Sequence, residues 1–151
     1  MASGQLKVRV ESAGNSTLFR ATGEASGVTI LVDAPRGEGA VPRGPKPMEL
    51  LSMSLATCVA TNLVEILNKK RIPYESVRLE IEAERDEEPP RRFTALQMRC
   101  VVKSDALEPR VLEQALALAE KHCPASATLT HGLTLTAQAE VEREGGETGE
   151  V

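Results

Sequence analysis

Two of the three cysteines stand where thiol chemistry is feasible. Cys58 lies in the middle of a stretch that reads as a helix without a breaker until Ile72. Cys123 is preceded by His122 and followed by Pro124, so it lies where a helix breaks and its side chain can face a pocket. Two thiols that meet can form a redox pair, in which one is oxidised and the other closes a disulfide with it. The spacing leaves a second interpretation open, in which Cys58 is simply a small buried hydrophobe.

The stretch around Cys58 predicts a long helix, buried on more than one side, within residues 44–71. Pro47 suits the first turn, where a backbone N–H is not needed, and Glu49 complements the positive end of the helix dipole. Every fourth position of one row is apolar: Leu51, Leu55, Val59, Leu63 and Leu67. The strip beside this row is small and polar: Ser54, Cys58, Thr61 and Asn62. Such a strip is more polar than a sealed core requires, which favours a functional Cys58.

Alternating apolar and polar residues predict strands before and after this helix. In chain order the other elements are three strands, two strands, a second helix and a last strand: residues 5–12, 16–22, 28–32, 77–84, 93–103, 108–122 and 133–141. The order β-β-β-α-β-β-α-β predicts an α+β fold with antiparallel sheets. Cys100 belongs to the inward row of its strand, and we interpret it as structural. We expect one domain over residues 1–142 and a flexible, acidic tail over residues 143–151.

Length, charge and composition narrow the classes of function. The chain has 151 residues, a net charge of -4 and only 2% aromatic residues. Its basic residues are scattered among acidic ones, which argues against a nucleic-acid partner. The N-terminus shows no secretion signal, and the longest mainly apolar run, residues 50–60, is too short to cross a membrane. We therefore expect a cytoplasmic protein without a membrane partner and, with an odd number of cysteines, without a structural disulfide framework.

A metal site at the cysteines is an alternative to thiol chemistry. The residues that invite it are Cys58, His122, Cys123 and His131. Structural zinc sites contain closely spaced ligand pairs such as C-x-x-C, and this chain has none. It also lacks a glycine-rich phosphate loop and a dinucleotide fingerprint. We therefore expect neither a metal nor a nucleotide cofactor.

Four segments together resemble the OsmC/Ohr family of thiol-dependent hydroperoxide reductases, and their details are closest to its OsmC-like branch. The segments are GPKPMELLSMSLATC, VATNLVEILNKK, RRFTALQMRCVV and ALALAEKHCPASATL. The match runs from about Gly44 to the last predicted strand, and the three N-terminal strands agree with it in order. Each segment is moderately specific by itself, whereas all of them in this order and spacing are strongly so. The two cysteines of the family pattern fall on Cys58 and Cys123.

The resemblance implies both a reaction and an assembly. Cys58 would attack an organic hydroperoxide and become a sulfenic acid, and Cys123 would resolve it to a disulfide. An external dithiol would then reduce the disulfide by exchange. The resemblance also implies an intertwined homodimer, with two central helices back to back between sheets built from both chains. A helix that is apolar on more than one side needs more cover than one small chain readily supplies, which agrees with a dimer.

Two departures from the family pattern concern activation of Cys58. Ohr-type members carry a catalytic glutamate directly after the helix-start proline, whereas Met48 holds that position here and Glu49 comes next. The catalytic arginine has no anchoring motif, so Arg20, Arg36 and Arg43 are all candidates. Arg36 and Arg43 lie in a loop whose composition favours a plain surface connection over a contribution to the site. A second hypothesis is therefore a dimeric small-molecule-binding protein that kept the fold and lost fast peroxide chemistry.

The expected substrate follows from the side chains on the helix upstream of Cys58. The residues available to line a pocket there are Leu50, Leu51, Met53 and Ser54. Such a lining is apolar and adaptable, because methionine fits irregular shapes. We therefore expect alkyl or lipid-like hydroperoxides to be preferred over hydrogen peroxide, which gains nothing from burial of apolar area.

Overall fold

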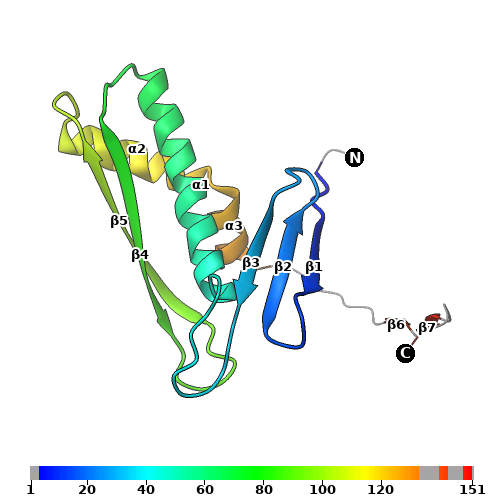
Figure 1. The fold of residues 1–151 in the computed structure, drawn as a ribbon. Helices are drawn as coiled ribbons and strands as arrows, with labels where there is room; N and C mark the ends of the chain where they lie inside the picture. The colour runs from blue at the N-terminus through cyan, green and yellow to red at the C-terminus, as the bar shows by residue number, and fades with distance from the viewer. Residues whose placement is uncertain (1–3, 133–139, 143–147, 151) are drawn as a thin grey trace.

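A computed structural model describes residues 4–132, 140–142 and 148–150. Figure 1 shows the long helix α1 in the centre, with the β4–β5 hairpin on one side and the sheet of β1, β2 and β3 on the other. The elements up to the hairpin are β1 (Val8–Ser12), β2 (Leu18–Gly23), β3 (Thr29–Asp33), α1 (Pro47–Lys69), β4 (Ser76–Arg85) and β5 (Phe93–Lys103). The remaining elements are α2 (Pro109–Lys121), α3 (Pro124–His131), β6 (Glu140–Glu142) and β7 (Thr148–Glu150). The sheets are antiparallel, which confirms the predicted α+β class.

Helix α1 follows the sequence prediction closely. It begins at Pro47, and Glu49 caps its first turn, because the backbone N–H of Lys46 donates to the Glu49 carboxylate at 2.8 Å. Four members of the predicted apolar row are buried: Leu55, Val59, Leu63 and Leu67. The fifth, Leu51, is 36% exposed, because the row leaves the core near the start of the helix.

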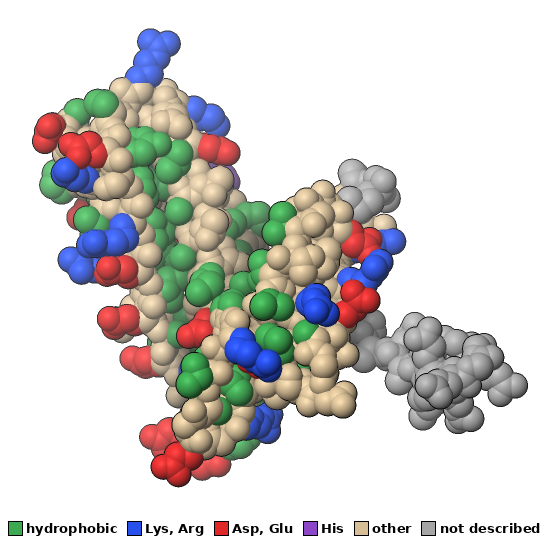
Figure 2. Space-filling model, viewed as in Figure 1, with side chains coloured by type: hydrophobic (Ala, Val, Ile, Leu, Met, Phe, Trp, Pro, Cys, Tyr) green, Lys and Arg blue, Asp and Glu red, His purple; other side chains and the backbone are tan. Residues whose placement is uncertain are grey.

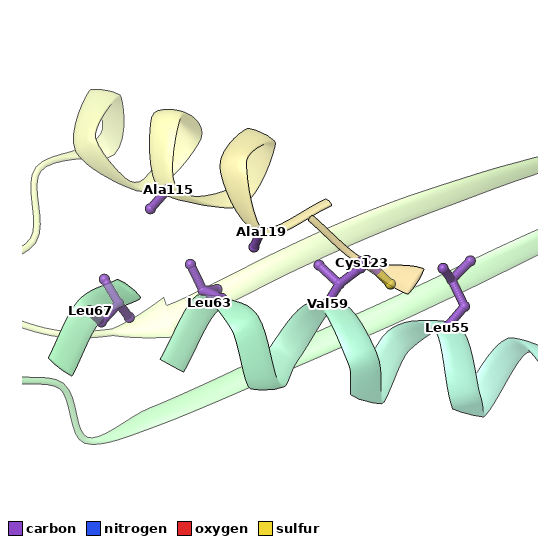
Figure 3. Packing of buried hydrophobic residues seen from close by; sticks show 7 residues of the cluster. All are labelled: Leu55, Val59, Leu63, Leu67, Ala115, Ala119 and Cys123. Carbon is purple, nitrogen blue, oxygen red and sulfur yellow. The ribbon is translucent and has the colours of Figure 1, made fainter. Parts of the chain in front are cut away.

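The buried row of α1 packs against α2 and the β4–β5 hairpin. Figure 3 shows Ala115 and Ala119 of α2 facing this row across a narrow gap, which small side chains allow. The inward side chains of the hairpin pack against the same core: Val77, Leu79, Ile81, Leu96, Met98, Cys100 and Val102. Cys100 is thus one of the partly buried residues around the core, as the strand pattern predicts.

A short helix, α3, is an element that the sequence prediction missed. The predicted second helix ends near His122 as expected, but the chain turns at Cys123 and continues as α3. The physical reason is that Pro124 occupies the first helical position, where a missing N–H costs nothing, so it starts a new helix as well as ending the old one. The predicted last strand lies mostly outside the described residues, although β6 pairs with β7. Flexibility of residues 143–151 stays a prediction.

The N-terminal sheet presents an apolar face that the described part of the chain leaves open. In the register of the sheet Val8 pairs with Gly23, Val10 with Ala21, and Ala21 with Ile30, so these side chains share one face. On this face Val8 is 71% exposed, Val10 58%, and Phe19 and Ile30 38% each. Figure 2 shows hydrophobic side chains over this sheet and toward the hairpin, and charged ones along the hairpin's outer edge. A surface of this kind points to a partner.

By length and composition alone, α1 could cross a membrane, contrary to the expectation from the sequence. An 18-residue window of the helix has a mean hydropathy of 1.7. The run of residues 50–60 ends before Thr61 and Asn62, whereas an 18-residue window of this helix extends across both. The row from Leu55 to Leu67 is nevertheless packed in the core against α2, as in the central helix of a globular domain.

Candidate thiol site

Cys58 and Cys123 come together in the fold, although 65 positions separate them in the chain. Cys58 lies close enough to Cys123 to raise the pKa of the Cys123 thiol, and all three cysteines are free. Cys58 is half-buried on α1, whereas Cys123 is only 1% exposed. Figure 3 shows Cys123 pointing from the junction of α2 and α3 toward α1, between Val59 and Leu55. The two neighbouring thiols therefore differ in exposure.

The surroundings of Cys123 keep its thiol protonated. Burial is the largest cause that raises the pKa of Cys123 above its ordinary value of 9.0, and the neighbouring Cys58 thiol acts in the same direction. The backbone N–H of Ser126 opposes them, since it donates to Cys123 Sγ at 3.3 Å. Cys123 is the N-cap residue of α3, and this bond is the cap. The same donor would stabilise a thiolate at this position.

A cavity of about 460 Å³ is lined by neighbours of the two cysteines, Leu55 on α1 and Ser126 on α3, but neither cysteine belongs to its lining. Its lining comes from α1, the hairpin, α2 and α3: Leu55, Ile81, Leu96, Met98, Glu113, Leu116, Ala117, Glu120, Ser126, Leu129 and Thr130. A second cavity of about 640 Å³ shares Leu96, Leu129 and Thr130 with the first and is also lined by Met48 and Leu51. We call these two adjoining cavities the groove; it runs from the start of α1 to the neighbours of the cysteines. Its lining is mainly apolar and includes Arg91 and Arg92 in the second cavity. Of the pocket residues expected from the sequence, only Leu51 lines either cavity.

Glu49 is engaged elsewhere in this chain. Its carboxylate accepts the backbone N–H of Lys46 and so belongs to the cap of α1. It also precedes Cys58 by nine residues, which is about 13 Å along a helix axis. Met48, at the position of the glutamate of Ohr-type members, lines the groove and adds apolar surface there.

The three candidate arginines lie on the N-terminal sheet and the loop that follows it. Arg20 pairs with Glu11 in the register of β2 and β1, on the face opposite the apolar one, and Arg36 is exposed in the loop. Arg43 is held by Asp33, whose carboxylate accepts its backbone N–H at 3.0 Å and its Nε at 3.3 Å. The Arg43 guanidinium also donates to the Ser16 hydroxyl at 3.0 Å, so Arg43 is bound to Asp33 and Ser16 of the N-terminal part.

The metal alternative gains no support from the described residues. Within 4–132, 140–142 and 148–150, no group of three or more His, Cys, Asp or Glu side chains is arranged to hold a metal ion. His131 instead contacts the carbonyl of Ala127 within α3, through Nδ1 at 2.9 Å.

Two residues near the cysteines were not predicted from the sequence. Ser126 donates its backbone N–H to Cys123, and its hydroxyl donates to Glu120 Oε1 at 2.8 Å. The signal that could have found Ser126 is the run Cys123-Pro124, because a proline at the first helical position predicts a helix whose early N–H groups point back to the preceding residue. Glu120 carries no such signal, since it reads as an ordinary exposed residue of α2.

Comparison with known sequences decides the family. The profile of the family described as OsmC-like protein matches residues 37–138, which include both cysteines. The chain belongs to the OsmC-like protein family. Protein YhfA of Escherichia coli is 34% identical over 118 residues, which cover 78% of this chain and 85% of YhfA.

Solved structures share the OsmC-like fold at low sequence identity. An OsmC-like protein from Mycoplasma pneumoniae superposes with a TM-score of 0.71 at 17% identity, over 85% of this chain and 89% of that one. The organic hydroperoxide resistance protein OhrB of Bacillus subtilis gives a TM-score of 0.56 at 19% identity, over 84% and 92%. The α+β architecture is therefore that of the OsmC-like and Ohr proteins. The name of OhrB assigns hydroperoxide resistance to that Bacillus subtilis protein.

Proposed function

We propose that this OsmC-like protein is a thiol-dependent peroxidase that reduces organic hydroperoxides in oxidative stress defence, with Cys58 as the peroxidatic and Cys123 as the resolving cysteine. The observation that carries the proposal is that a half-buried and a fully buried thiol are neighbours, and that residues next to them line a mainly apolar cavity. Hydroperoxide resistance in the name of a structural neighbour agrees with it. Glu49 and Arg36 are weaker candidates for supporting roles.

The reaction is balanced without a metal or nucleotide cofactor. The Cys58 thiolate attacks the distal oxygen of the hydroperoxide; the O–O bond breaks, an alcohol leaves after protonation, and Cys58 becomes a sulfenic acid. Cys123 then attacks Cys58 Sγ, an S–S bond forms, and the sulfenic hydroxyl leaves as water. An external dithiol reduces the disulfide by two exchange steps and returns both thiols.

The unequal exposure of the two thiols supports this division of roles. A hydroperoxide reaches a half-buried Cys58 more readily than a Cys123 that is 1% exposed. The raised pKa of Cys123 keeps it as a thiol until Cys58 has been oxidised, so it does not compete for the substrate. The two cysteines are already neighbours in the fold, which favours closure of the disulfide.

The groove supports an organic substrate. Leu96 and Leu129 line both of its cavities, and Leu55, one turn before Cys58, lines the inner one. An alkyl or lipid-like hydroperoxide gains roughly 25 cal/mol for each Å² of apolar area that it buries in such a groove, whereas hydrogen peroxide gains none. We place the reaction in the cytoplasm, where free thiols persist and dithiol reductants are abundant.

A homodimer is part of the proposal. The open face of β1, β2 and β3, with Val8 and Val10 more than half exposed, is too apolar to stay uncovered in water. A second copy of the chain is the simplest cover, and it would also enclose parts of α1 that the described chain leaves exposed, such as Met53. The active site would then lie near the contact between the two copies.

Turnover with a dithiol tests the proposal. The wild-type protein is expected to consume cumene or tert-butyl hydroperoxide with dithiothreitol much faster than hydrogen peroxide, and Cys58→Ser is expected to consume neither. Cys100→Ser is the matched control, because Cys100 is a partly buried thiol on β5 outside the pair. A Cys58→Ser variant that turns over at the wild-type rate would refute the assignment.

A binding protein of the same fold is the second candidate, and Met48 is the observation that favours it. An apolar residue in place of a glutamate enlarges the groove surface, and the neighbouring Glu49 is bound in the helix cap. This candidate expects Cys58 to react as slowly as an ordinary free thiol with all three oxidants. Alkylation of Cys58 measured against pH separates the two, because a thiolate that persists below neutral pH is useful only to an enzyme.

A further inference from the structure

The outer cavity of the groove, of about 640 Å³, carries positive charge at the tip of the β4–β5 hairpin. Arg91 and Arg92 line this cavity together with Met48 and Leu51 of α1, and they are the charged residues of its described lining. Arg92 already has a partner, because its Nε donates to Asp86 Oδ2 at 2.8 Å. Arg91 is exposed and forms no ion pair within the described part of the chain. The charge of Arg91 is therefore available to a ligand in the groove.

The turn between β4 and β5 holds Arg91 in one place. The backbone N–H of Arg91 donates to the carbonyl of Glu88 at 3.0 Å, and the carbonyl of Arg91 accepts the Nε of Arg85 at 2.7 Å. The φ angle of Arg91 is 54°, in the left-handed region that a long side chain adopts only where its surroundings fix it. The N–H of Asp86 also donates to the carbonyl of Arg92 at 3.0 Å, across the same turn. A ligand at Arg91 thus meets a cation whose backbone is already ordered, which lowers the entropy cost of binding.

The inner cavity, of about 460 Å³, carries the opposite charge. The charged residues of its described lining are Glu113 and Glu120, both exposed on α2. Seven positions separate these two glutamates, which is about two helical turns, so they lie on one face of α2. The cavities adjoin at Leu96, Leu129 and Thr130, which line both. A ligand that fills the groove therefore meets a cation at the outer end, apolar side chains in between and carboxylates at the inner end.

We propose that the groove binds a single-chain carboxylate, with its head group at the Arg91 guanidinium and its alkyl chain directed toward the inner cavity. A guanidinium and a carboxylate form charge-assisted hydrogen bonds, and the chain gains by burying apolar area. Glu113 and Glu120 repel the head group, so the reverse orientation is disfavoured. Both cavities have volumes within the range of roughly 300–1,000 Å³ that is usual for small-molecule sites. The inference goes beyond the proposed function, because such a site serves a peroxidase and a binding protein alike.

Three ligands with matched chains and different head groups test the role of charge: decanoate, decanol and decyltrimethylammonium. In titration calorimetry at neutral pH and low salt, decanoate is expected to bind about fivefold more tightly than decanol, as for an exposed ion pair. Decyltrimethylammonium is expected to bind more weakly than decanol. Added salt should remove the advantage of decanoate, because it screens the exposed Arg91. Tighter binding of decyltrimethylammonium than of decanoate would overturn the inference, since the glutamates of the inner cavity would then select the head group.

Chain length tests the role of the apolar lining. Hexanoate has the same head group as decanoate and a shorter chain. Its affinity is expected to fall roughly fourfold for each methylene group that is no longer buried. Equal affinities of hexanoate and decanoate would mean that the chain does not enter the groove, and would overturn the inference.

Substitution of Arg91 tests the position of the head group. Arg91→Gln is expected to lower the affinity for decanoate about fivefold and to leave that for decanol unchanged, whereas Arg91→Lys keeps most of the affinity for decanoate. The matched control is Arg99→Gln, because Arg99 is an exposed arginine of β5 outside the lining of both cavities. Unchanged decanol binding shows that the groove of a variant is intact. Equal affinities of Arg91→Gln and Arg99→Gln for decanoate would overturn the inference, and so would a wild-type protein that does not bind decanoate.

These titrations contain no peroxide, so they are independent of the thiol reaction. Cys58→Ser is expected to bind decanoate as the wild type does, because Cys58 does not line either cavity. If decanoate binds through Arg91 while hydroperoxides fail to oxidise Cys58, the inference stands and the peroxidase proposal falls. If the protein reduces hydroperoxides but binds decanoate no more tightly than decanol, the peroxidase proposal stands and the inference falls.

Discussion

The side-chain amide of Asn62 donates a hydrogen bond to the backbone carbonyl of Ala119 at 3.0 Å, one helical turn from each cysteine of the pair. Asn62 follows Cys58 by four residues, and Ala119 precedes Cys123 by four. The N–H of Cys123 bonds to the carbonyl of Glu120, so the helical partner expected for the Ala119 carbonyl is diverted. The amide of Asn62 takes its place and ties α1 to α2 at the level of the two thiols.

Replacement of Asn62 by alanine is expected to lower the free energy of unfolding by about 1–2 kcal/mol, because the carbonyl of the buried Ala119 loses its partner. Closure of the Cys58–Cys123 disulfide should also slow, since α1 and α2 lose a fixed contact. Urea denaturation followed by circular dichroism measures the first effect. Thr61→Ala is the control: the Thr61 hydroxyl bonds only to the carbonyl of Thr57 among the described residues, within the same helix. Equal destabilisation by both substitutions would contradict a role for the Asn62 bond.

Asp33 predicts a dependence of stability on acid pH. Its carboxylate is 1% exposed and accepts hydrogen bonds from the backbone N–H and Nε of Arg43 and from the Thr17 hydroxyl. These bonds, that of the Arg43 N–H first, hold the pKa of Asp33 below its ordinary value of 3.8. The unfolded chain therefore binds a proton at this residue more readily than the folded chain does.

The stabilisation from Asp33 is accordingly complete above pH 3.8 and is lost as the pH falls through the lower folded pKa. Asp33→Asn should remove part of the slope of unfolding free energy against pH between about pH 2 and 4. It should also weaken the hold on Arg43 at neutral pH. Asp105→Asn, at an exposed aspartate after β5, should keep the wild-type slope. Urea titrations across this range give both slopes, and identical slopes for the two variants would contradict the prediction.

Ala117 offers a way to fill the inner cavity without disturbing the core, because it is exposed on α2 and lines that cavity. Ala117→Phe is expected to lower the rate of Cys58 oxidation by cumene hydroperoxide several-fold, while the rate with hydrogen peroxide stays unchanged. Ala127→Phe makes the same change at an exposed position of α3 outside the cavity lining and serves as the control. Stopped-flow oxidation measures each rate. A cumene rate unaffected by Ala117→Phe would mean that the substrate does not use this cavity.

The two faces of the N-terminal sheet predict different effects on assembly. Ile30 and Leu31 are neighbours on β3 with similar exposure, 38% and 43%, but only Ile30 lies on the open apolar face. If a second copy covers that face, wild type should sediment at about twice the chain mass of 16.2 kDa. Ile30→Glu should shift the equilibrium toward the monomer, whereas Leu31→Glu should not. A compact wild-type species at the mass of one chain would refute the dimer.

The sequence by itself determined the parts of this protein that depend on local patterns. The four-residue row from Leu55 to Leu67, with Pro47 at its start, defines α1 because helix formation depends on neighbouring residues. The alternation in residues 77–84 and 93–103 likewise predicted the hairpin. The family could also be inferred, since its motifs are short segments around Cys58 and Cys123 that can be read without a structure.

The tertiary structure alone decided which groups meet. The proximity of Cys58 and Cys123, and the place of Asn62 beside Ala119, depend on how α1 and α2 cross, which no local pattern specifies. Glu49 could not be separated from a catalytic carboxylate until its bond to the cap of α1 was seen, and Arg91 could not be singled out until the fold placed it in the lining of the groove. Some of these pairings join residues that are distant in sequence, and others depend on the orientation of a single side chain. Both are decided by how the elements pack.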